Sequence, residues 1–149
     1  MYKHILVPTD GSVLSDKAVV AAIKLAKLAG ARITAFHTVE SYPLQGAYAA
    51  EASGVAELQP EIFAQRSEEY AKRVLNAVAA AAAAENVQCT TAYGTGNSAS
   101  QAIVEKANED QCDLIVMASH GRRGLEGFLL GSETQKVLTH SSIPVLVYR

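Results

Sequence analysis

The chain has 149 residues, of which 49% are hydrophobic, and a formal net charge of −2 with the charges spread along the sequence. This size and composition predict one globular domain with its own hydrophobic core and exclude a disordered chain. The balanced charge argues against partners such as nucleic acid or a membrane surface. No apolar segment reaches membrane-spanning length, and the N-terminus lacks the apolar core of a signal peptide, so we expect a cytoplasmic protein.

The first forty residues predict a strand, a helix and a second strand. The apolar residues 3–8 predict a buried strand, and the turn and capping residues 9–12 follow it. Apolar residues at helical spacing then predict a helix that ends at Gly30. Residues 32–39 predict the second strand, so this part of the chain forms a right-handed βαβ unit with parallel strands.

A long segment without a regular pattern, residues 40–59, separates this unit from the rest of the chain. A segment of this length is either a binding loop or an insertion without function, and the sequence leaves both open. Pro60 begins a long helix that is expected to end near Glu85. Its predicted buried face consists of Ile62, Arg66, Tyr70, Val74 and Val78.

The remaining elements alternate between strands and helices. Residues 87–93 predict a third strand that ends at a turn beginning with Gly94, and Asn97 or Ser98 is expected to cap a helix that ends near Glu109. Residues 114–117, 132–140 and 145–148 predict a strand, a short helix and a last strand. Cys89 and Cys112 form no CxxC pair, so we expect both to be buried free thiols.

Five predicted strands that alternate with helices indicate an α/β fold, with a parallel, Rossmann-like sheet covered by helices on both faces. Ligands in such folds bind beyond the carboxyl ends of the strands. Three segments are expected at that edge of the sheet, namely residues 9–12, the start of residues 40–59, and residues 118–132.

The segment 118–132 has the features of a phosphate site. It joins the end of a strand to the start of a helix through a loop that contains Gly121, Gly124 and Gly127. Glycines let the backbone approach an anion closely, and the free N–H groups of a helix N-terminus attract negative charge. The loop contains neither a Walker A motif nor the glycine pattern of dinucleotide-binding proteins, so it belongs to neither of those classes.

This segment resembles the nucleotide-binding motif of the universal stress protein family. Members that bind nucleotides have the pattern G-x2-G-x9-G-[ST] after the fourth strand, and it aligns here with Ala118, Gly121, Gly131 and Ser132. The segments PTDGS, residues 8–12, and SSIPVLVYR, residues 141–149, resemble the first loop and the last strand of the family. The resemblance therefore covers the whole chain as one domain, residues 1–149.

The resemblance implies a fold, a ligand and an assembly. The fold is a five-stranded parallel sheet in the order 3-2-1-4-5, and the ligand is ATP, with or without Mg²⁺. The assembly is a homodimer formed through Val145, Leu146 and Val147 of the last strand. An unprotected edge strand is prone to aggregation, and pairing with a second copy would cover it.

Applied residue by residue, the resemblance implies a nucleotide site built from three loops. Asp10 is expected near the adenosine, and Val39 is expected to contact the adenine through its backbone. Gly121 and Arg122 would lie beside the phosphates, and the helix that begins at Ser132 would offer them its N–H groups. The implied site residues are Pro8, Thr9, Asp10, Val39, Ala118, His120, Gly121, Arg122, Gly131, Ser132, Glu133 and Thr134.

Two residues depart from what a phosphate site would need. Ala118 stands where the family motif has a glycine. A methyl group there costs roughly 1–2 kcal/mol if the position needs a positive φ or a close approach of the ligand, and almost nothing if it needs only a small residue in an extended conformation. Glu133 suits a helix N-terminus, but its carboxylate would repel a phosphate unless it points away or shares a magnesium ion.

Three functions remain open at this stage. The first is a cytosolic ATP-binding regulatory protein of the stress response, and the second is a dimer that has lost nucleotide binding and acts through unidentified protein partners. The third is a slow ATPase that uses Asp10 or Glu133 with a metal ion. Asp10 could equally be only a turn residue. No catalytic or metal site is expected, because the histidines lack ligand spacing and the adjacent Ser119 and His120 have poor geometry for a nucleophile and its base.

Overall fold

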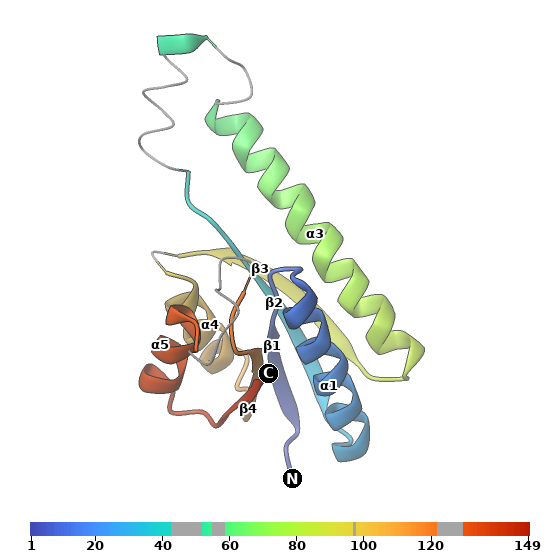
Figure 1. Cartoon of the computed structure of the whole chain (residues 1–149). Helices are drawn as coiled ribbons and strands as arrows, with labels where there is room; N and C mark the ends of the chain where they lie inside the picture. The colour runs from blue at the N-terminus through green and yellow to red at the C-terminus, as the bar shows by residue number, and fades with distance from the viewer. Residues whose placement is uncertain (43–51, 55–58, 97, 122–129) are drawn as a thin grey trace.

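The computed structural model describes residues 1–42, 52–54, 59–96, 98–121 and 130–149. Strands and helices alternate along these residues, as the sequence predicts (Figure 1). The elements are β1 (His4–Pro8), α1 (Val13–Ala29), β2 (Arg32–Val39), α3 (Pro60–Ala84), β3 (Cys89–Thr95), α4 (Ala99–Glu109), β4 (Leu114–Ala118), α5 (Ser132–His140) and β5 (Val145–Tyr148).

The five strands form one sheet in the order β3-β2-β1-β4-β5, and every adjacent pair is parallel. The predicted strand order is therefore confirmed. Helices α1 and α3 cover one face of the sheet, and α4 and α5 cover the other (Figure 1). The described helices include none that is long and apolar enough to span a bilayer.

Alternate residues of the central strands enter two separate hydrophobic cores, because successive side chains of a strand point to opposite faces. Ile5 and Val7 of β1 pack under α1 and α3, whereas Leu6 of the same strand packs under α4 and α5. All residues of β1 and β4 are buried. Burial on both faces explains why these strands are continuous apolar runs in the sequence.

The third strand lies two residues later than predicted. Val87 is buried, but its N–H group bonds to the Ala82 carbonyl at the end of α3, so it packs in the core before the strand begins. The strand then continues through Gly94, which pairs with Thr38, to Thr95. The turn predicted at Gly94 is wrong, because an edge strand tolerates a glycine as long as its partner strand continues.

The buried face of α3 also differs from the prediction. Only Val78 of the predicted face is buried, together with Ala71, Leu75 and Ala82. Residues 60–70 contain no buried side chain, because this part of the helix extends past the sheet (Figure 1). The periodicity of large side chains was misleading here, since alanines face the sheet.

The two cysteines are free thiols, as expected, but only Cys112 is buried, and Cys89 is half-buried. Burial is the main cause that raises the pKa of Cys112, to about 12. This thiol therefore stays protonated and unreactive at neutral pH.

A network of polar side chains joins β1, β2 and the end of α4 at the amino edge of the sheet. The buried His4 donates through Nε2 to Thr34 Oγ1 at 2.8 Å, and Thr34 donates to Asp110 at 3.1 Å. Arg32 donates to Nδ1 of His4 at 3.1 Å, so this imidazole is neutral. Lys106 pairs with Asp110 at 2.9 Å. Burial, followed by the charge of Arg32, lowers the pKa of His4, although Asp110 and Asp113 act in the opposite direction.

We predict that His4 makes the free energy of unfolding fall as the pH drops below the pKa of an unfolded histidine, about 6.5. In that range His4 binds a proton more readily in the unfolded chain than in the folded protein, so acid favours unfolding. In urea titrations at about pH 7 and about pH 5.5, His4→Gln should be less stable than the parent at the higher pH. The free energy of unfolding of His4→Gln should also fall less than that of the parent between about pH 7 and about pH 5.5.

The matched control is His140→Gln, which changes an exposed histidine on α5 and should retain the pH dependence of the parent. An unaltered pH dependence in His4→Gln would show that other groups produce it.

Candidate functional site

A cavity of about 910 Å³ opens where the carboxyl ends of β1, β2, β3 and β4 meet. The cavity exists because β1 ends early: Pro8 pairs with Phe36, whereas β2 continues to Val39. The starts of α4 and α5 form its opposite wall. A space of this size holds a small organic ligand.

The predicted site residues lie together around this cavity. Arg122 lies outside the described residues, as do Arg123, Gly124, Gly127 and most of the segment 40–59. Every other predicted site residue lines the cavity, namely Pro8, Thr9, Asp10, Val39, Ala118, His120, Gly121, Gly131, Ser132, Glu133 and Thr134.

Asp10 is a turn residue and also borders the cavity. Its Oδ1 accepts the N–H of Ser12 at 3.0 Å, which is the turn role that the sequence allowed. Its Oδ2 lies against the backbone of Gly121, so closely that a Cβ atom at residue 121 would collide with it. Gly121 is therefore required by the close approach of Asp10, because its own φ is not positive.

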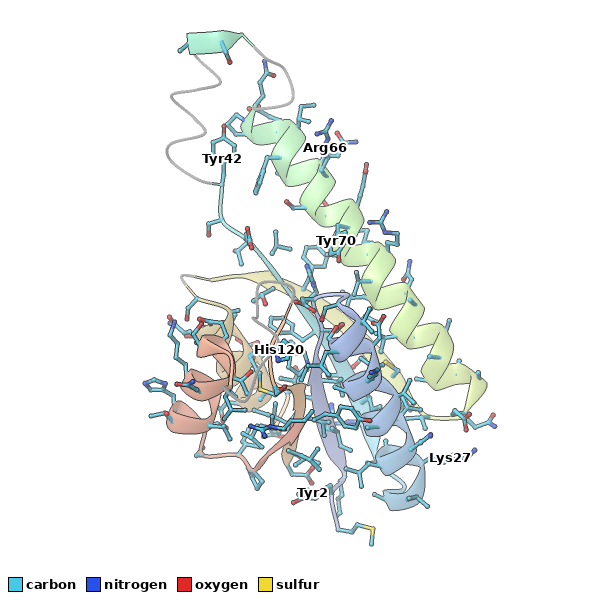
Figure 2. The ribbon with its side chains drawn as sticks, in the orientation of Figure 1. Tyr2, Lys27, Tyr42, Arg66, Tyr70 and His120 are labelled. Atoms are coloured by element: carbon cyan, nitrogen blue, oxygen red, sulfur yellow. The ribbon has the colours of Figure 1, made fainter. Side chains whose placement is uncertain are left out.

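Two side chains from other elements fix the loop that carries Asp10. His37 of β2 donates through Nδ1 to the Thr9 carbonyl at 2.8 Å, and Tyr70 of α3 donates to the Asp10 carbonyl at 2.8 Å. The two rings also touch, with their centroids 5.5 Å apart. Tyr70 extends from α3 toward the sheet (Figure 2).

Tyr70 reaches this loop because of a glycine. Gly11 has a φ of +74°, and a Cβ atom there would lie 2.5 Å from the Tyr70 hydroxyl. Both the left-handed conformation and the contact with α3 favour glycine. The sequence analysis assigned Tyr70 to the helix core and missed its role at the loop, since the contact joins residues that are 60 positions apart.

The backbone of Thr38, rather than that of Val39, faces the open end of β1. Along β2, the N–H of Arg32 and the carbonyl of Phe36 form backbone hydrogen bonds on the β1 side, whereas the N–H of Ile33 forms one on the β3 side. This alternation directs the N–H and carbonyl of Thr38 toward β1, which has already ended, and those of Val39 toward Thr95 of β3. The backbone groups at the open end of β1 thus belong to Thr38, one residue before Val39, which also lines the cavity.

Ala118 occupies an extended position at the end of β4. It pairs with Tyr148, and its carbonyl accepts the Thr134 hydroxyl at 3.1 Å. Among the described residues other than glycine, only Asn86 and Gln111 have a positive φ, so the Ala118 methyl imposes no backbone strain. The cost that a positive φ would have caused at this position is therefore absent.

The N-terminus of α5 is open toward the cavity. Gly131 at the N-cap has no side chain that could cap the helix, and among the described residues the first N–H that bonds back to this start is that of Gln135. The N–H groups at Ser132, Glu133 and Thr134 thus have no partner within the helix. A Cβ atom at Gly131 would lie 3.2 Å from both Cα and Cβ of His120, which is why glycine occurs there.

The N-terminus of α4 lines the same cavity but is capped. The Ser98 hydroxyl accepts the N–H of Gln101 at 3.3 Å, and Oε2 of Glu133 accepts the N–H of Ser100 at 2.7 Å. Lys136 pairs with the other oxygen of Glu133 at 2.7 Å. Burial acts to raise the pKa of Glu133, but the hydrogen bonds from Lys136 and Ser100 outweigh it and hold this pKa below its usual value. Glu133 is therefore an anion that points to α4.

Ser119 and His120 are in contact, although the sequence suggested poor geometry for such a pair. The Ser119 hydroxyl lies 3.2 Å from Nδ1 of His120. His120 lines the cavity, but Ser119 is only 4% exposed and is not among the lining residues. Ser119 thus cannot serve as a nucleophile for a ligand in this cavity. Within the described part of the chain, no three His, Cys, Asp or Glu side chains form a group that could hold a metal ion.

The sequence analysis missed part of the cavity wall. Gly96 follows β3 at the same carboxyl edge, so the rule that identified the other loops would have found it. Ile103 and Met117 form apolar wall and were assigned only to the core. Glu40 and Ser41 belong to the start of residues 40–59, which was expected at this edge. The other described lining residues were missed, namely Ser15, His37, Thr38, Gly96, Ser98, Ala99, Ile103 and Met117.

Known proteins resemble this chain in both sequence and structure. The sequence pattern of the Universal stress protein family matches residues 1–149. The universal stress protein MJ0531 of Methanocaldococcus jannaschii is 36% identical over 149 residues, which cover 100% of this chain and 83% of that protein.

Two solved structures extend the comparison. The hypothetical protein MJ0577 superimposes with a TM-score of 0.79 and 26% identity, over 99% of this chain and 96% of that one. A universal stress protein in complex with cAMP gives a TM-score of 0.71 with 25% identity, over 99% and 97% of the two chains. Sequence, strand order and fold agree, and the chain belongs to the universal stress protein family.

Proposed function

We propose that this chain is a regulatory protein of the stress response that binds ATP in the cavity, with the phosphates at the N-terminus of α5. The observation that carries this proposal is the uncapped start of α5, whose free N–H groups line the cavity. Such groups bind anions through hydrogen bonds and the helix dipole. A relative of similar fold is known in complex with cAMP, another adenine nucleotide.

The adenine would occupy the other end of the cavity. Ile103 and Met117 offer apolar surface to the ring. The N–H and carbonyl of Thr38 face the space beyond β1, where they can bond to the edge of the base. Asp10 lies between these two regions, beside Gly121, in a position suited to the ribose.

Binding is favoured over hydrolysis. Both oxygens of Glu133 are engaged, by Ser100 and Lys136, so this carboxylate is not available as a base. Any Mg²⁺ would be held mainly by the ligand phosphates, because the described residues offer no group of three suitable side chains.

We predict that freshly purified protein, once denatured, releases an adenine nucleotide that mass spectrometry identifies, and that calorimetry detects ATP binding to the emptied protein. Gly121→Ala should weaken this binding about tenfold, since the methyl group displaces the Asp10 carboxylate. The proposal would be refuted if the protein released no nucleotide and calorimetry detected no heat with millimolar ATP.

A second glycine provides the control for this experiment. Gly94 has ordinary room for a methyl group, 3.4 Å from the ring of Phe36, and does not line the cavity. Gly94→Ala should therefore bind ATP as the parent does.

We predict that Ala118→Gly changes the ATP affinity by less than about threefold, because the extended backbone of residue 118 already accepts alanine. Calorimetry on the two proteins measures the difference. A large gain in affinity would instead support the alternative function, a dimeric interaction protein in which Ala118 has abolished nucleotide binding.

We also propose that the chain forms a homodimer through Val145, Leu146 and Val147 of β5. β5 is an edge strand that pairs only with β4 in the sheet, and Leu146 is 41% exposed. An apolar edge strand of this kind is a template for pairing with another chain, and a two-fold axis would cover both copies at once.

We predict that Leu146→Lys converts the dimer into a monomer in sedimentation experiments, because the change places a charge on each side of the contact. Leu28→Lys, which alters an exposed leucine on α1 instead, should leave the dimer intact. A parent protein that sediments as a monomer would rule out this assembly.

A further inference from the structure

We propose that Tyr70 is a positioning residue of the nucleotide site: its hydroxyl holds the peptide group after Asp10 in the orientation that lets the Asp10 carboxylate accept a hydroxyl of the ligand ribose. Tyr70 thereby sets the preference of the site for ribonucleotides over analogues that lack the ribose hydroxyls. The role assigned to Tyr70 rests on the proposed function, and it places a determinant of ligand recognition outside the cavity.

Tyr70 lies at the point where α3 leaves the sheet. Residues 60–70 have no buried side chain, whereas the next residue, Ala71, is fully buried and begins the part of α3 that packs in the core. From this anchored turn of the helix, the Tyr70 hydroxyl donates to the Asp10 carbonyl at 2.8 Å. A helix that is fixed in the core therefore holds one point of the loop.

The peptide group between Asp10 and Gly11 depends on this bond. Its orientation is linked to the φ of Gly11, which is +74°. Glycine adopts positive and negative φ with similar ease, so Gly11 by itself does not hold the peptide group in one orientation. The N–H of Gly11 bonds to Thr9 Oγ1 at 3.2 Å, which is a longer bond and comes from the same loop. Tyr70 supplies the shorter bond and ties the peptide group to a different element.

A rotation of this peptide group would move the Asp10 carboxylate, which borders the cavity. Its Oδ1 accepts the N–H of Ser12 at 3.0 Å, and its Oδ2 lies against the backbone of Gly121. A carboxylate can accept about four hydrogen bonds through its two oxygens, so these contacts leave capacity for a ribose hydroxyl. Because a binding group must stay within roughly 0.5 Å of its productive position, the bond from Tyr70 matters for recognition.

Tyr70 acts on the ligand through Asp10. It is absent from the described residues that line the cavity, and its hydroxyl lies against Gly11 instead. Loss of this hydroxyl should therefore weaken the binding of a ligand to the extent that the ligand uses the Asp10 carboxylate. This dependence distinguishes a positioning role from a general effect on stability.

The test compares ATP with dideoxy-ATP, which lacks both ribose hydroxyls but keeps the adenine and the phosphates. Calorimetry should show that the parent binds ATP roughly tenfold more tightly than dideoxy-ATP. Tyr70→Phe keeps the ring beside His37 and Arg73 and removes the hydrogen bond to Asp10. We expect it to weaken ATP binding roughly fivefold and the binding of dideoxy-ATP less than about twofold.

Asp10→Ala provides a second variant, because it removes the carboxylate itself. It should lose most of the preference for ATP over dideoxy-ATP. Adding Tyr70→Phe to it should then weaken ATP binding by less than about twofold, since two residues that act through one contact are not additive. A purely structural role of Tyr70 would lower both affinities by the same factor and would persist without the carboxylate.

Tyr2→Phe is the matched control, because Tyr2 is an exposed tyrosine that precedes β1, at the opposite end of the sheet from Tyr70 (Figure 2). Its ratio of ATP to dideoxy-ATP affinity should equal that of the parent. If the parent binds both ligands equally, or if Tyr70→Phe leaves the ratio unchanged, the role of Tyr70 is refuted while the proposed function stands. If the parent binds neither ligand, the proposed function fails and the role of Tyr70 fails with it.

Discussion

The early end of β1 is the constraint on which the rest of the site depends. Thr9 donates the last bond of this strand to Phe36, and the chain then turns at Asp10. Because β2 continues to Val39, the backbone of Thr38 is left facing an open space at the centre of the sheet edge. A parallel sheet brings the carboxyl ends of its strands to one edge, so Gly96 after β3 and His120 and Gly121 after β4 line this same space.

The glycines around the cavity are required for different physical reasons, which the motif alone does not distinguish. Gly11 needs both a positive φ and room for Tyr70, whereas Gly121 and Gly131 need only room, for Asp10 and His120 respectively. Ala118 has no positive φ, because the residue is still part of β4. A departure from a glycine motif therefore causes no backbone strain where the position belongs to a strand.

Local patterns in the sequence predicted the helix ends, since capping residues and apolar runs act over a few positions, whereas the strand order and the site residues were implied by the resemblance to the family. The errors involve contacts between distant parts of the chain. The buried face of α3 depends on how far the helix extends past the sheet. The direction of the Thr38 backbone toward the open end of β1 follows from the pairing of β2 with both of its neighbouring strands. The bond from Ser100 to Glu133 joins two helices and has no signature in either segment.

Helices α1, α4 and α5 all start at the same edge of the sheet, and side chains decide which of these N-termini keep free N–H groups. The geometry of the fold treats α4 and α5 alike, because each follows a strand and starts at the cavity. At α4, Ser98 and Glu133 satisfy free N–H groups, whereas at α5 Gly131 offers no side chain to do so. An N–H group that already has a strong internal acceptor gains little from a ligand. Which helix start lacks a cap is therefore a property of single residues that strand order and cavity shape leave open.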